Sequence, residues 1–114
     1  MRTNFIVILV TCASKKEAGA LADRLLKKRL IACANILPGL DSKFRWKGKI
    51  ENAKEFLVLI KTKLDNFKAI ERELKLLHSY EVPEIIAIPI VAGSRDYLSW
   101  VNKNLRAEGP EKGF

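Results

Sequence analysis

Three stretches of the chain carry apolar residues three or four positions apart, which is the spacing of one helix face. The first, over 14–29, opens with a Ser-x-x-Glu capping box and ends in a basic turn. The second, over 65–78, has Asp65 in position to cap its first turn. The third, over 94–105, begins at a serine. The pattern predicts three amphipathic helices, each with one face toward a core.

Two aliphatic runs in the first third of the chain predict buried strands. Residues 4–11 are rich in β-branched side chains and too few for a helix of average length. Residues 31–37 have a similar character and are followed by Pro38 and Gly39, whose dihedral preferences favour a turn or a kink. We therefore expect the second strand to stop before this pair.

A long hairpin is predicted next. Positions 42–50 alternate, so that Phe44 and Trp46 share one face while lysine and arginine residues occupy the other. Gly48 marks a tight turn, and 53–62 contains a continuous apolar run that is typical of a buried strand. A domain of this size does not readily cover two large aromatic rings by itself, which favours self-association.

A fourth strand is expected over 84–90, because Pro83 ends the preceding helix and Pro89 places part of the strand at a sheet edge. The order strand, helix, strand, strand, helix, strand with a terminal helix predicts an α+β fold. It is the ferredoxin-like, split βαβ arrangement, an antiparallel sheet covered by helices on one face. The uncovered apolar face again indicates association with further copies.

One domain is expected for residues 1–114, since the chain is long enough for one core and too short for two. Residues 106–114 have no periodic pattern and are expected to form a tail. The apolar runs are short, and Cys12 and Cys33 lack CxxC spacing, so we expect a cytoplasmic protein with reduced thiols and no membrane partner. The composition, with 30% charged residues and no glutamine, resembles that of thermostable proteins.

The net charge of +8 raises nucleic acid as a partner. The basic residues are scattered, however, and a solvated helix face explains those near the end of the first helix. An RNA-recognition fold would also carry exposed stacking rings and a glycine in its third strand, whereas 56–60 is uniformly apolar. Nucleic acid is therefore disfavoured.

Polar side chains crowd the junction between the second helix and the fourth strand. His78, Tyr80, Glu81 and Glu84 offer an imidazole, a phenol and two carboxylates within one short turn. They either bind a cation or satisfy exposed backbone groups. A copper or zinc site needs three or four ligands, so His78 would require help from the carboxylates or from Cys33, in part from another subunit. Cys33 also fits the alternative of a small buried hydrophobic residue.

Five ordered motifs give the chain a resemblance to the CutA family of divalent-cation tolerance proteins. They are 33–36 (CANI), 42–50 (SKFRWKGKI), 61–62 (KT), 77–84 (LHSYEVPE) and 97–100 (YLSW). The resemblance covers nearly the whole chain. It implies a homotrimer similar to the PII signalling proteins, joined through the long hairpin, with a role in tolerance of copper or other divalent cations and no cofactor needed for folding.

Several positions depart from that family's pattern. Ser79 stands where the family usually has proline, and Phe44 where it usually has tyrosine. Some bacterial members have a proposed copper-binding cysteine at the end of the first strand, and the matching position here is Val10. Cys12 lies nearby but out of register with that position.

A PII-like trimer also implies a cleft between subunits. Lys61 and Glu55 flank the apolar run of the third strand and, with Tyr80, are the residues expected to line a ligand cleft. An ordinary ion pair is the alternative for Lys61 and Glu55. Aromatic residues are expected to anchor the trimer interface; they are Phe44, Trp46, Tyr97 and Trp100.

The sequence motifs favour a binding protein over an enzyme. There is no phosphate-cradling glycine loop, no HExxH and no CxxC, and the single histidine has no nucleophile at a recognisable spacing. The leading hypothesis is a trimer that binds copper or another divalent metal ion. The alternatives are a trimer that binds a small ligand in its clefts, or one that only scaffolds a partner.

Overall fold

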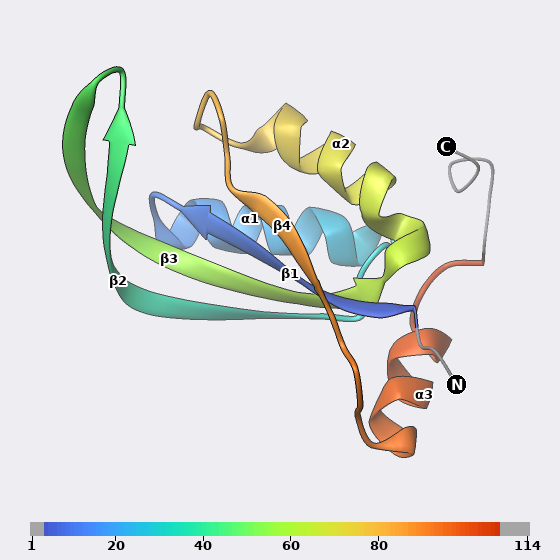
Figure 1. Cartoon of the computed structure of the whole chain (residues 1–114). Coiled ribbons are helices and arrows are strands. Elements are labelled where there is room, and N and C mark those ends of the chain that lie inside the picture. The colour runs from blue at the N-terminus through green and yellow to red at the C-terminus, as the bar shows by residue number, and fades with distance from the viewer. Residues whose placement is uncertain (1–3, 108–114) are drawn as a thin grey trace.

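The computed structural model describes residues 4–107, so most of the expected tail over 106–114 lies outside the described residues. The chain forms a four-stranded sheet with three α-helices (Figure 1). In chain order the elements are β1 (Phe5–Cys12), α1 (Lys15–Lys27), β2 (Cys33–Trp46), β3 (Lys49–Lys63), a 3-10 turn (Leu64–Asn66), α2 (Phe67–Leu77), β4 (Ile85–Pro89) and α3 (Arg95–Lys103).

The sheet has the strand order β2-β3-β1-β4, and every neighbouring pair is antiparallel. This arrangement confirms the predicted ferredoxin-like fold. It also confirms β4 as an edge strand, where Pro89 is tolerated because one side of the strand has no ladder to supply. Among residues 4–107, no helix has the length and apolar character needed to cross a membrane.

The core lies between one face of the sheet and helices α1 and α2. Alternate residues of β1 and β3 point into it, as Ile8 and Ile60 do from opposite positions of the ladder. Leu25 of α1 and the pair Ile70 and Leu74 of α2 meet them there, and all five side chains are fully buried. Packing on one sheet face therefore fixes the positions of both helices.

The second strand does not stop at Pro38 and Gly39, and that prediction is wrong. β2 continues to Trp46, and the irregularity is a bulge between Leu37 and Leu40, where Gly39 has a φ of +82°. β2 is an edge strand, so the missing N–H of Pro38 costs little, and the glycine absorbs the bulge.

The long hairpin is confirmed, and its second strand is longer than expected because β3 begins at Lys49 and not at Ala53. Lys47 and Gly48 form its two-residue turn with φ values of 50° and 79°, as a type I′ turn requires. β1 pairs with β3 only from Phe56 onward, so the distal part of the hairpin extends past the sheet as an arm (Figure 1).

The helix ends were predicted in part. Ser14 caps α1, accepting from the Glu17 N–H at 3.1 Å, and Ser94 caps α3 in the same way. Asp65 does not cap α2, since it lies within the 3-10 turn and α2 begins after Asn66. The Asn66 side chain instead donates to the Leu30 carbonyl at 3.0 Å, which ties the start of α2 to the end of α1.

A buried carboxylate joins α1 to α2. Glu73 accepts from Arg24 Nε and lies beside Lys28 Nζ, both at 3.1 Å. Burial alone would raise the pKa of Glu73, but the hydrogen bond and charge of Lys28, together with Arg24, hold that pKa below its ordinary value of 4.5. The carboxylate is therefore ionised and stabilises the helix pair at neutral pH.

We expect Glu73→Gln to lower the free energy of unfolding at neutral pH by about 1 kcal/mol, because the partners Arg24 and Lys28 are half exposed and solvent screens them. Since the folded pKa is depressed, this contribution is present above pH 4.5 and is lost as pH falls through the lower folded value. Denaturant titrations from pH 7 to pH 3 measure it. Glu71→Gln, which removes an i,i+4 pair with Lys75, is the matched control. A pH-independent difference for Glu73→Gln would contradict the assignment.

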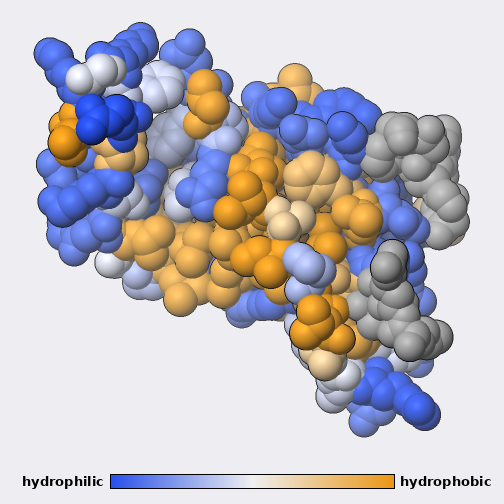
Figure 2. Space-filling view, viewed as in Figure 1, coloured by the Kyte–Doolittle hydropathy of each residue, from blue (hydrophilic) through white to orange (hydrophobic). Residues whose placement is uncertain are grey.

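The sheet face opposite α1 and α2 is apolar and open to solvent. Figure 2 shows a hydrophobic band across this side of the molecule. Ile86 and Ile88 of β4 lie opposite Leu9 and Val7 in the ladder, and their side chains are 49% and 48% exposed. We call this side the open face of the sheet.

Candidate functional site

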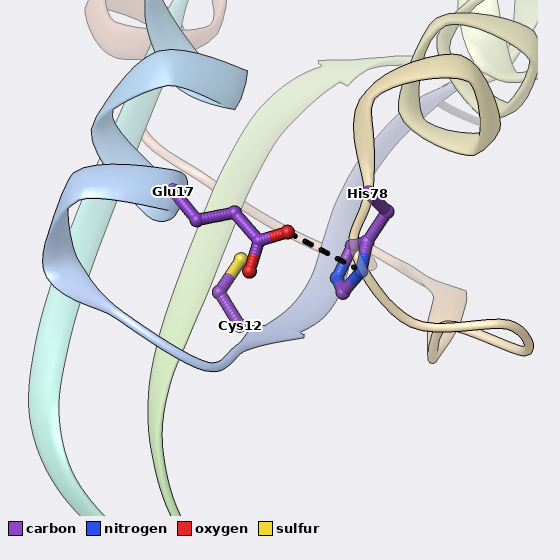
Figure 3. Close-up of side chains that lie close together, drawn as sticks. All are labelled: Cys12, Glu17 and His78. Atoms are coloured by element: carbon purple, nitrogen blue, oxygen red, sulfur yellow. Dashed lines mark ion pairs between the residues drawn. The ribbon is translucent and has the colours of Figure 1, made fainter.

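Three potential metal ligands meet at one end of the sheet. Cys12 is the last residue of β1, Glu17 lies in the first turn of α1, and His78 follows the last turn of α2 (Figure 3). One ligand atom from each lies within 4.8 Å of the other two. β1 and β4 are antiparallel neighbours, so the chain leaves β1 and enters β4 at the same end of the sheet.

His78 is held by the backbone on both sides of its ring. Its side chain has no exposed surface. Nε2 lies 2.8 Å from the Thr11 carbonyl, which can only accept, and Nδ1 lies 3.0 Å from the Tyr80 N–H, which can only donate. These partners assign the neutral tautomer with its proton on Nε2. His78 therefore satisfies backbone groups at the end of α2, which is one of the two roles expected for this junction. Its ring also lies close to two other potential metal ligands, Cys12 and Glu17.

Glu17 binds backbone amides from two segments. Oε1 accepts from Ala13 at 3.2 Å, completing the capping box, and Oε2 accepts from Ser79 at 2.6 Å. Burial alone would raise the pKa of Glu17, but the hydrogen bonds from these amides lower it below the ordinary value. Oε2 lies 3.7 Å from Nδ1 of His78, so an ionised carboxylate faces the ring.

Cys12 is a fully buried thiol beside that carboxylate. Burial, followed by the charges of Glu17 and Glu55, raises the pKa of Cys12 from 9.0 to about 12. The thiol is therefore protonated at neutral pH, and a metal ion would have to displace its proton to bind a thiolate.

Tyr80 links the site to the hairpin. Its hydroxyl donates to Oε2 of Glu55 at 2.6 Å, and its ring lies 4.8 Å from that of His78. Glu55 is only 6% exposed. Burial and the Glu55 carboxylate raise the pKa of Tyr80 far above its usual range, so the hydroxyl keeps its proton and remains a donor. Two residues predicted for the cleft, Glu55 and Tyr80, thus lie in contact.

Within one chain, the other predicted site residues lie elsewhere. Cys33 pairs with Lys61 in the ladder, four positions along the sheet from the level of Thr11, which corresponds to about 13 Å. Lys61 hydrogen-bonds Asn35, not Glu55. Glu81 and Glu84 are exposed. Their roles as ligands therefore remain predictions that need a second subunit.

The aromatic residues predicted for an interface are exposed. Phe44 and Trp46 lie near the tip of the arm, and Lys47 Nζ lies 5.7 Å from the Trp46 ring centre. Tyr97 and Trp100 stack on each other on α3, with ring centres 5.7 Å apart. In the isolated chain all four side chains are therefore accessible to another subunit.

Sequence reasoning missed Cys12 and Glu17. Cys12 had been noted only as out of register with the position of Val10, yet its ligand atom lies within 4.8 Å of those of Glu17 and His78, while Val10 is buried in the core. A signal was present. The capping box placed a carboxylate at the first strand-to-helix junction, and the split βαβ topology brings that junction to the end of the sheet where the second helix enters the fourth strand.

Comparison with known proteins gives consistent matches over most of the chain. Residues 6–104 match the family model described as CutA1 divalent ion tolerance protein. The divalent-cation tolerance protein CutA of Thermus thermophilus is 44% identical over 98 residues, covering 86% of this chain and 95% of the relative. That of Archaeoglobus fulgidus is 45% identical over 102 residues, covering 90% and 97%.

Solved structures agree with these sequence matches. The divalent cation tolerance protein from Thermus thermophilus superposes with a TM-score of 0.87 at 42% identity, covering 90% of this chain and 99% of that one. CutA1 from Oryza sativa superposes with a TM-score of 0.88 at 37% identity, covering 92% and 96%. The fold and the sequence therefore indicate the same relatives.

Proposed function

Because the chain belongs to the CutA1 divalent ion tolerance family, we propose that it binds a divalent metal ion, copper or zinc in particular, through Cys12, Glu17 and His78. The observation that supports this proposal is the convergence of a thiol, a carboxylate and an imidazole within 4.8 Å. Thiolate and imidazole donors favour copper and zinc over magnesium and calcium.

The same geometry predicts modest affinity. The described part of the chain offers three donor side chains at this site, and a fourth ligand would come from water or from another subunit. The Cys12 proton and the amides bound to Glu17 and His78 must also be displaced or shared. We therefore expect the site to prefer copper or zinc because of the thiol, but to bind either ion weakly.

Calorimetric titration with copper(II) and zinc tests the metal site. We expect binding of one ion per chain by the unmodified protein, and a loss of roughly tenfold or more in affinity for Cys12→Ser, Glu17→Gln and His78→Ala. Glu71→Gln is the matched control, because this carboxylate lies on α2 outside the cluster of three and is paired with Lys75. Tight binding that survives His78→Ala would refute the site.

We also propose that the protein is a homotrimer. The open face of the sheet exposes a hydrophobic band, and β2 and β4 leave two strand edges that no other strand within residues 4–107 covers. The arm extends past the sheet, where it could pair with a neighbouring copy. A closed three-fold ring would satisfy all three features at once.

A binding role in the cytoplasm completes the proposal. Both ring nitrogens of His78, the only histidine of the chain, are hydrogen-bonded to the backbone, so the ring is not poised as a general base.

Reduced thiols suit the cytoplasm, although relatives include proteins named chloroplastic and a solved structure described as periplasmic. Localisation of a tagged chain by fractionation tests this assignment.

A further inference from the structure

Tyr80 contacts the proposed metal site through two different groups. Its backbone N–H donates to Nδ1 of His78 at 3.0 Å. Its hydroxyl donates to Glu55 on β3 at 2.6 Å. The backbone of Tyr80 is therefore held against the ring by an anchor on the hairpin.

The first contact blocks metal binding at Nδ1. An imidazole nitrogen has one lone pair in the ring plane, so Nδ1 cannot accept the Tyr80 N–H and bind an ion at once. The Glu17 carboxylate differs, because its oxygens have several lone pairs and could keep the Ser79 amide while binding an ion. Of the two amides that follow His78, only that of Tyr80 must leave.

The opposite ring nitrogen offers no easier route. Nε2 carries the proton and donates it to the Thr11 carbonyl at 2.8 Å. Thr11 is the residue before Cys12 at the end of β1. Use of Nε2 would require the buried ring to turn over and both backbone groups to lose their partners. Nδ1 already faces Glu17, so it is the nitrogen that an ion would use.

We propose that Tyr80 is the gate of the metal site, in which its hydroxyl bond to Glu55 keeps its backbone N–H on the His78 lone pair. Metal binding then requires the backbone N–H of Tyr80 to move away from the ring. This inference rests on the proposed function, and it makes Tyr80 a positioning residue that opposes binding. The anchor, Glu55, lies on β3 where the arm leaves the sheet. Metal binding would therefore be coupled to the conformation of the chain at the base of the arm.

The gate is tested with zinc, which is redox-inert and leaves the Cys12 thiol unoxidised. We expect Tyr80→Phe to bind zinc roughly three- to tenfold more tightly than the unmodified chain, because the amide loses its anchor. Tyr97→Phe is the matched control, since Tyr97 lies on α3 away from the cluster. Hydrogen exchange of the Tyr80 amide, followed by NMR in the unmodified chain, should become faster when zinc is added.

The outcomes separate the gate from the site. Zinc affinity that is unchanged or weaker in Tyr80→Phe, with a Tyr80 amide that stays protected in the zinc-bound chain, overturns the gate and leaves the metal site standing. Absence of zinc binding in the unmodified chain and in Tyr80→Phe overturns the proposed function itself. Binding seen only in Tyr80→Phe supports the gate. If Tyr80→Phe fails to fold, amide exchange in the unmodified chain still decides.

Discussion

Replacement of His78 by alanine is expected to lower the free energy of unfolding by about 2–4 kcal/mol, even without metal. The side chain is fully buried, so its removal leaves a cavity. It also leaves the Thr11 carbonyl and the Tyr80 amide without these partners, and both hydrogen bonds are partly buried. Urea titration at a fixed protein concentration measures the change.

The control for this prediction is the nearby residue Leu76, which is 72% exposed. Leu76→Ala should change the free energy of unfolding by less than about 0.5 kcal/mol. If His78→Ala were as stable as Leu76→Ala, the ring would not be a structural element of the junction. The residue would then be held in place for metal binding alone.

Substitution of Ile88 by aspartate is expected to convert the proposed trimer to single chains at micromolar concentration. Ile88 is about half exposed on the open face of an isolated chain, so the carboxylate should cost the monomer little. In a trimer that covers this face, the same carboxylate would lose its hydration without a partner, at a cost of several kcal/mol. Sedimentation velocity distinguishes three chains from one.

Two further variants sharpen the assembly test. Trp46→Ala removes an anchor near the tip of the arm and should weaken assembly, whereas Lys15→Ala on the exposed side of α1 should not. An unmodified chain that sediments as a monomer would rule out the trimer. A trimer that persists in Ile88→Asp would show that the open face is not the interface.

The sequence predicted the fold well where the local pattern and the tertiary structure agree. The apolar runs of β1 and β3 predicted strands because both are central and buried on the core side. The failure at Pro38 has a physical reason, since a proline breaks a central strand but is tolerated at a sheet edge, and edge position is a tertiary property. The same holds for Asp65, which lost the cap position to a 3-10 turn fixed by Asn66 and Leu30.

The site was predicted only as far as one segment could show it. His78 and Tyr80 lie close together in the chain and were both singled out. Cys12 and Glu17 are distant from them in sequence, and a register argument based on Val10 directed attention away from the thiol. Val10 and Cys12 point to the same face of β1, and position along the strand decided which of them lay beside the ring, because Cys12 is at the end of β1 and Val10 is within the core.

The two-residue turn at Lys47 and Gly48 limits how the arm can vary in length among related proteins. Side chains alternate between the two faces of a strand, so one residue inserted between the bulge and the turn would exchange Phe44 and Trp46 with the basic residues on the other face. An arm that keeps its aromatic side can therefore gain or lose residues only two at a time in each strand. Single insertions should be confined to the bulge or to the turn itself, where the ladder is already interrupted.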